Sequence, residues 1–252
     1  MKRIKIDGTT VKIPESWDEI TLGFYETWYH RQPATTREKV ELAAEICRIK
    51  PERLLSARAD TFNRIARLLA FAFNNEAPTP SPMLTAKGVK YTVTPSAELT
   101  LAQWVDADEA QHSGEKPLSS LLAIVCLPPG EKYDPSRFND RQQLFASLKM
   151  SETLGVLGFF FTLRQHIART FESLFADTTN RRPVAAEYKS FSDRWGWYKV
   201  IADLAGDKIL SLDAVVALPA TQVFTFISYL NEKAAAEDSQ QTFEKQLGGR
   251  FF

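Results

Sequence analysis

The chain begins with a short stretch in which apolar and polar side chains alternate. Within residues 2–13, the apolar positions lie on both sides of Asp7-Gly8. An Asp-Gly pair between two alternating runs is a strong signal for a tight β-turn that joins two antiparallel strands. The pattern therefore predicts a β-hairpin over residues 2–13, closed by Pro14.

The hydropathy period then changes from two residues to that of a helix. Ser16 with Glu19 fits a capping box, and Thr21 can cap a further helix start. Apolar residues then recur at helical spacing. We expect three helices, which cover residues 22–29, the segment from Thr35 to just before Pro51, and residues 62–73.

The same pattern then begins again. Prolines at 78, 80 and 82 favour extended backbone, and residues 89–93 alternate as a strand. Four residues of the first part recur at a constant offset of 79, since Glu19, Thr21, Leu22 and Cys47 match Glu98, Thr100, Leu101 and Cys126. The offset indicates a duplicated unit. A coincidence of common helix-start residues is the alternative.

The second half of the chain reads as helical. A helix over residues 118–125 ends before Pro128-Pro129-Gly130, and a long helix is expected over residues 151–175. After a polar break at residues 177–183, further amphipathic helices are expected over the ranges 188–204, 212–218 and 223–230, followed by a solvated helix and a tail over 238–252.

These elements predict the fold class. We expect a mainly α protein with small β-hairpins (α+β), in which two related hairpin-plus-helices lobes precede a C-terminal helical region. The expected segments are residues 1–76, 86–176 and 184–252.

Composition and charge narrow the classes of partner. The chain has 252 residues, of which 44% are hydrophobic, so it can build a substantial core. Its 31 basic and 31 acidic residues balance, which argues against a partner held mainly by its phosphates and against an anionic membrane surface. The opening residues lack the apolar core of a secretory signal, so Cys47 and Cys126 are expected as free thiols in a reducing cytosol.

No pattern typical of catalysis is found in the sequence. His30, His112 and His166 lie in separate segments, so no metal site is expected. Glu26 and Asp108 each precede a histidine by four residues, and we interpret both pairs as surface ion pairs. There is no Gly-x-Ser-x-Gly elbow and no phosphate-binding loop. We therefore expect a protein that is not an enzyme and needs no cofactor.

The densest aromatic site is Arg194-Trp195-Gly196-Trp197-Tyr198. If Trp195 and Tyr198 face the core of a regular helix, Trp197 reaches solvent or a partner, because successive residues step by about 100° around the helix axis. Core packing of the whole cluster is the alternative. Basic residues around this cluster leave nucleic-acid binding as a further hypothesis, which the neutral net charge disfavours.

Three blocks of the sequence resemble small virion-morphogenesis proteins of tailed bacteriophages, in particular tail assembly chaperones. These blocks are residues 14–22 with Tyr25, the run Trp195-Gly196-Trp197-Tyr198, and the helix from Leu218-Pro219 to Leu230. The resemblance implies a non-enzymatic protein of the bacterial host cytoplasm that keeps tail-tube or tape-measure subunits soluble until they assemble. A structural component of the virion tail or head-tail connector is the alternative.

From these observations we expect the protein to act by presenting aromatic surfaces to other phage structural proteins, with oligomerisation possible and without a membrane partner. The residues expected to contact a partner are Trp17, Tyr25, Trp28, Trp104, Trp197, Phe251 and Phe252.

Overall fold

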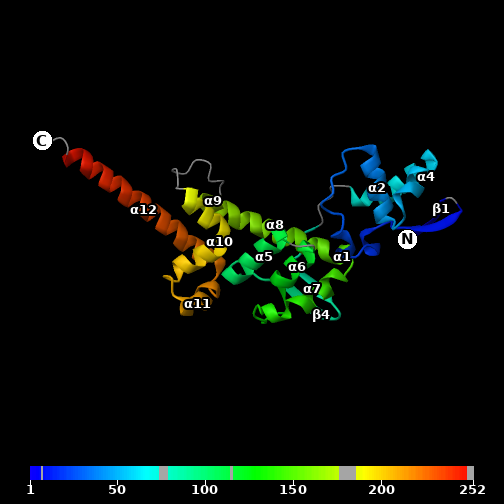
Figure 1. Ribbon diagram of the computed structural model, residues 1–252. Coiled ribbons are helices and arrows are strands. Elements are labelled where there is room, and N and C mark those ends of the chain that lie inside the picture. The colour runs from blue at the N-terminus through cyan, green and yellow to red at the C-terminus, as the bar shows by residue number, and fades with distance from the viewer. Residues whose placement is uncertain (7, 74–78, 114–115, 176–185, 249–252) are drawn as a thin grey trace. The chain divides into compact units, whose positions relative to one another are not determined.

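The computed structural model describes residues 1–6, 8–73, 79–113, 116–175 and 186–248 (Figure 1). Helices dominate, together with two small antiparallel sheets, so the expected mainly α fold with small hairpins is confirmed. The chain divides into two compact units. Unit 1 comprises residues 1–93 and 107–161, and unit 2 comprises residues 94–106 and 162–252. The sequence led us to expect three consecutive segments. The two units are not consecutive, because residues 94–106 belong to the same unit as the C-terminal part of the chain.

Both sheets lie in unit 1. Strands β1 (Lys2–Ile6) and β2 (Thr9–Ile13) form the expected first hairpin, with Ile4 opposite Val11. Strands β3 (Met83–Ala86) and β4 (Val89–Val93) form a second hairpin, which β5 (Cys126–Leu127) extends along β4. Each hairpin buries one face, in agreement with the alternating hydropathy of its strands.

The helices that lie wholly in unit 1 are short. They are η1 (Trp17–Glu19), α1 (Leu22–Tyr25), α2 (Thr36–Ile46), α3 (Pro51–Leu55), α4 (Ala59–Leu68), η2 (Leu69–Ala72), α6 (Pro117–Val125), η3 (Pro135–Arg137) and α7 (Phe138–Ala146). The fully buried side chains of unit 1 include Ile13, Ile20, Leu22, Ile65, Leu69, Leu121, Leu122, Phe145 and Phe160.

Two helices have residues in both units, namely α5 (Leu101–Ser113) and α8 (Met150–Thr170). The other helices of unit 2 are α9 (Glu172–Phe175), α10 (Ala186–Leu204), η5 (Ile209–Ser211), α11 (Leu212–Val216) and α12 (Ala220–Gly248). The expected helix over 151–175 is therefore interrupted after Thr170. The buried apolar side chains of unit 2 are fewer, and include Leu99, Leu101, Trp104, Ile167, Val223 and Phe224.

Two of the three N-terminal helix caps expected from the sequence are present in the structure. The Thr21 hydroxyl accepts a hydrogen bond from the Phe24 amide at 3.3 Å, and Thr35 forms a capping box with Glu38. The capping box expected for Ser16 and Glu19 is wrong. Residues 17–19 form a 3₁₀ turn, and the Glu19 carboxylate instead accepts from the amide of Glu15 at 2.7 Å.

The expected tail over residues 238–252 is also corrected, because α12 continues as a helix to Gly248. Its exposed part carries side-chain pairs one turn apart, such as Lys233 with Glu237 and Gln240 with Glu244. Such pairs stabilise a solvated helix that has no apolar face to bury. The chain was expected to be helical directly beyond Asn231, and this part of the prediction is confirmed.

Each unit contains one long-range backbone pairing of the same kind. In unit 1, Thr21 bridges to Lys149, and in unit 2, Thr100 bridges to Pro219. Each bridge has two backbone hydrogen bonds of 2.8 Å with the same geometry, namely Leu22 N to Leu148 O, Met150 N to Ile20 O, Leu101 N to Leu218 O and Ala220 N to Leu99 O. The first helix start of each unit therefore docks at the start of a later helix, α8 or α12.

The offset of 79 recurs in helix ends as well as in these helix starts. Cys47 is the C-cap residue of α2, and Cys126 is the C-cap residue of α6. Both are buried free thiols. The two cysteines that match at the offset of 79 thus occupy equivalent helix positions.

Candidate functional site

Two of the aromatic residues expected to contact a partner lie in the core instead. Trp28 is 3% exposed and Trp104 is 4% exposed. The Trp28 ring packs edge-on against Tyr25 at 4.8 Å between centroids, and the Trp104 ring packs against Phe224 at 5.2 Å. The prediction that they are surface contacts is corrected, because their rings pack within their own units.

Trp17 and Tyr25 are half-buried and contact each other. Their ring centroids lie 5.4 Å apart, and Trp17 also packs against Phe71 at 5.1 Å. Burial raises the pKa of the Tyr25 hydroxyl, and the neighbouring Tyr29 raises it further. Only part of each ring is left for a partner. Phe251 and Phe252 lie outside the described residues.

A kink in α10 reverses the expected roles of its tryptophans. Gly196 has φ 46° and ψ −125°, which lies outside the helical region, so the regular 100° step fails there. Trp195 is 44% exposed and Tyr198 is 53% exposed, whereas Trp197 is half-buried. The Trp197 ring lies 6.2 Å from that of Phe224. Trp195 and Tyr198, and not Trp197, are thus the more available rings of this cluster.

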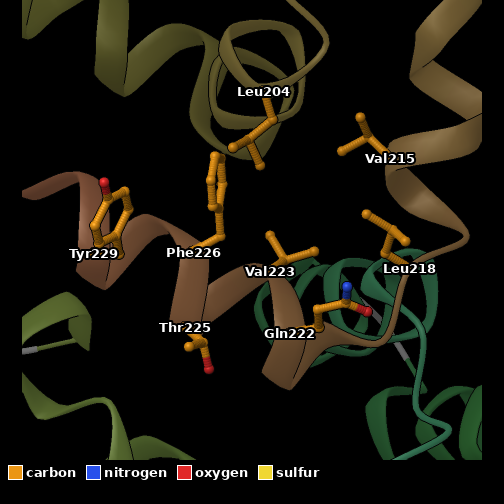
Figure 2. Close-up of a pocket in the computed structure, with 8 residues that line it drawn as sticks. All are labelled: Leu204, Val215, Leu218, Gln222, Val223, Thr225, Phe226 and Tyr229. Atoms are coloured by element: carbon orange, nitrogen blue, oxygen red, sulfur yellow. The ribbon is translucent and has the colours of Figure 1, made fainter.

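Unit 2 contains an open apolar groove along α12, which we call the α12 groove (Figure 2). Its volume is about 480 Å³. The residues that line it are Leu204, Val215, Leu218, Gln222, Val223, Thr225, Phe226 and Tyr229.

Helices α10, α11 and α12 each contribute to the groove. Figure 2 shows the Phe226 ring pointing toward Leu204 of α10, with Val223 beside it and Val215 of α11 across the opening. The Thr225 side chain points away from Phe226 and Leu204 and lies at the edge of the groove.

Several groove residues are unusually accessible for their type. Leu218 is 40% exposed, Phe226 is 51% exposed and Tyr229 is 57% exposed, although Val223 at the base of the groove is buried. None of the lining side chains carries a charge, and the polar groups are the Gln222 amide and the hydroxyls of Thr225 and Tyr229. A groove of this chemistry is suited to bind apolar groups.

The sequence predicts an amphipathic helix over residues 223–230, but its pattern alone did not identify this groove. One signal was present, because the run from Val223 to Leu230 contains six apolar or aromatic residues in eight positions. Such a run cannot be buried by a single neighbouring element, since it surrounds the helix.

The two carboxylates that were expected to pair with histidines have different surroundings in the structure. Glu26 was expected to pair with His30 at the surface, and this prediction is wrong. The Glu26 side chain is buried, and its carboxylate accepts hydrogen bonds from the Ser119 amide at 2.6 Å and from the Ser119 hydroxyl at 2.9 Å. Burial raises the pKa of Glu26, and the hydrogen bonds from Ser119 oppose that rise. Glu26 thus binds the start of α6.

The second expected ion pair is present. His112 is exposed, and its Nδ1 lies 3.9 Å from Asp108 Oδ1 and 2.8 Å from the Asp108 carbonyl oxygen. Both cysteines are buried, and burial raises the pKa of the Cys47 thiol to about 12 and raises that of Cys126 further. Neither thiol is activated as a nucleophile.

Among the described residues, no cluster of three or more His, Cys, Asp or Glu side chains could hold a metal ion. Over the same part of the chain, no helix combines the length and apolarity needed to cross a membrane. Comparisons of this chain with protein-family models, with curated proteins and with solved structures find no match.

Proposed function

We propose that this protein is a non-enzymatic assembly factor of a bacteriophage tail, and that the α12 groove binds an apolar segment of a tail-tube or tape-measure protein. Three features support the proposal. The groove is apolar and open, its lining has no charged side chain, and blocks of the sequence resemble tail assembly chaperones.

The observation that carries the proposal is the exposure of Leu218, which lies just before α12, and of Phe226 and Tyr229 on α12. Burying a side chain of this size contributes about 1.5–3 kcal/mol, so leaving several of them in water is unfavourable unless a partner covers them. Contiguous apolar surface on a soluble protein marks an interaction site.

A second exposed apolar pair lies in the same unit. Ile209 is 77% exposed and Leu210 is 95% exposed, in the 3₁₀ turn η5. The corresponding turn of unit 1, η3, carries exposed Pro135, Ser136 and Arg137. Unit 2 therefore presents apolar side chains where unit 1 presents mostly polar ones, which favours unit 2 as the binding part of the chain.

The proposal is tested by co-expressing the chain with a tail-tube protein and a tape-measure protein of a tailed phage. Soluble complex is measured by affinity capture and size-exclusion chromatography. Phe226→Ser should reduce the captured partner by about tenfold or more, as expected for an aromatic anchor. Phe243→Ser is the matched control, because Phe243 lies on the same helix, is 57% exposed and lies outside the groove.

Three results would contradict the proposal. Equal capture by the wild type and Phe226→Ser would remove the groove from the interaction. Capture of DNA with an affinity that falls steeply with salt would instead support the nucleic-acid hypothesis. Recovery of the chain in purified particles would identify it as a structural virion component.

A further inference from the structure

The two units allow the α12 groove to be compared with an equivalent face in the same chain. The backbone bridges align Leu148 with Leu218 and Met150 with Ala220, so α8 and α12 match at an offset of 70 residues. Helix α7 precedes α8 by the same spacing as α11 precedes α12. The offset pairs Phe145 with Val215, Gly155 with Thr225 and Val156 with Phe226.

In unit 1 this face is covered by an extended stretch of chain. The Ser81 amide donates a hydrogen bond of 3.0 Å to the carbonyl oxygen of Gly155 in α8. The carbonyl oxygen of Thr79 lies so near that a Cβ atom on Gly155 would meet it at 3.0 Å. The absence of a side chain at Gly155 is what permits this close approach.

The same stretch leads into the hairpin β3–β4, which covers α7. The Tyr91 ring of β4 packs edge-on against Phe145 with centroids 5.1 Å apart, and Phe145 is fully buried. Residues 79–93, which we call the covering segment, thus consist of an extended strap followed by a hairpin.

In unit 2, the equivalent positions are open. Thr225 is exposed, Val215 is only half-buried, and Phe226 is 51% exposed where its counterpart Val156 is 1% exposed. The described residues of unit 2 contain no β-hairpin.

We propose that the α12 groove binds an extended strap and a β-hairpin that a different protein supplies. This element would bind as the covering segment binds to α7 and α8. This inference rests on the proposed function and specifies the element that the partner contributes. A second copy of this chain is disfavoured as the donor, because both of its hairpins already bury their apolar faces in unit 1.

The groove also indicates how the occupant differs from the covering segment. Val215 is smaller than Phe145, so the occupant has room for a larger ring above it. The Thr225 side chain fills part of the space that Gly155 leaves open, so the strap of the occupant lies farther from the helix. Because the lining is uncharged, the buried face of the occupant is apolar.

A synthetic peptide with the sequence of residues 79–93 provides the probe. It is labelled with a fluorophore, and its binding to the full chain is followed by fluorescence anisotropy. Isolated two-stranded hairpins are marginally stable, so the wild-type chain should bind the peptide weakly.

Thr225→Gly recreates the gap found at Gly155 and should tighten peptide binding by about tenfold, the change that one close backbone contact can contribute. Thr225→Ala is the matched control. It keeps the Cβ atom that would obstruct the strap, so its affinity should remain that of the wild type. Adding Phe226→Ser to Thr225→Gly should remove the gain, whereas adding Phe243→Ser should preserve it.

Three outcomes would overturn the inference. The first is peptide binding that responds equally to Thr225→Gly and Thr225→Ala. The second is no measurable binding to Thr225→Gly. The third is self-association of the chain, measured by sedimentation, that Phe226→Ser abolishes, since this would make a second copy the occupant.

The two proposals fail separately. If the capture of tail proteins requires Phe226 but peptide binding is unchanged by Thr225→Gly and by Phe226→Ser, the proposed hairpin occupant is wrong and the docking function stands. If the tail proteins are captured without Phe226, the proposed function itself is wrong.

Discussion

Helices α8 and α12 begin in the same way, but side chains at equivalent positions are buried on α8 and exposed on α12. Each is joined at its first turn to an earlier helix start by two backbone hydrogen bonds of 2.8 Å. Beyond that point, Val156 and Phe160 of α8 are buried, whereas their counterparts Phe226 and Leu230 of α12 are 51% and 40% exposed. In unit 1, residues 79–81 also lie against α8 at Gly155, whereas the counterpart Thr225 of α12 is exposed.

This contrast distinguishes aromatic side chains that stabilise the fold from those that are available to bind a partner. In unit 1, the covering segment completes the core, and aromatic side chains there serve stability. In unit 2, similar side chains remain at the surface of a well-formed helix. An exposed ring on an ordered element is a better indication of binding than an aromatic residue chosen from the sequence alone.

The largest expected effect compares the same position in the two units. Phe145→Ala removes a fully buried ring and should lower the free energy of unfolding by about 3–5 kcal/mol. Val215→Ala, at the equivalent half-buried position, should lower it by about 1 kcal/mol or less. Urea unfolding followed by circular dichroism measures both. Equal losses would show that the two faces are equally covered.

A smaller effect is expected at the kink that exposes Trp195. Gly196→Ala forces a side chain into a conformation with φ 46° and ψ −125°, which should destabilise the protein by about 1–3 kcal/mol. No atom lies within 4 Å of the added Cβ, so the loss comes from backbone strain and not from a clash. Ser190→Ala, at an exposed position of α10, is the control. An unchanged stability would contradict the role assigned to the kink.

The smallest effect concerns the pH dependence of unit 1. Burial raises the pKa of Glu26 in the folded protein above its ordinary value of 4.5. The folded state therefore binds the proton more tightly than the unfolded state, and the contribution of Glu26 to stability is greatest below pH 4.5 and declines as pH rises through the folded pKa. Glu26→Gln does not titrate, so the wild type should lose stability relative to this variant over that range.

Unfolding in urea at several pH values between about 4 and 8 measures this difference. Glu52→Gln, at an exposed position of α3, is the control variant. A gap between wild type and Glu26→Gln that stays constant with pH, or that moves in favour of the wild type as pH rises, would contradict the assignment.

The local elements were predictable because each is encoded by neighbouring residues. The Asp7-Gly8 pair and the alternation around it indicate the first hairpin, and Thr35 with Glu38 indicates the start of α2. The offset of 79 identified two equivalent helix starts and two equivalent cysteines, both of which the structure contains. These signals depend on short-range spacing.

The site was not predictable, because it depends on contacts between distant residues. The burial of Trp104 results from rings such as Phe224, which lies 120 positions later in the sequence. The partner of Glu26 is Ser119 and not the nearby His30. The exposure of Trp195 follows from one non-helical glycine, which the regular periodicity of α10 conceals. The helical spacing of apolar residues indicates that a helix has an apolar face, but it does not indicate what covers that face.

The most direct test of the central claim is the rate at which a thiol at matched positions reacts with a water-soluble maleimide. The native Cys47 and Cys126 are both buried, so they provide a slow background. The account predicts that the Phe226→Cys variant is labelled at least about tenfold faster than the Val156→Cys variant, and that a bound tail protein slows only the former. Equal labelling rates in the two variants would contradict the claim that the α12 face is open and the α8 face is covered.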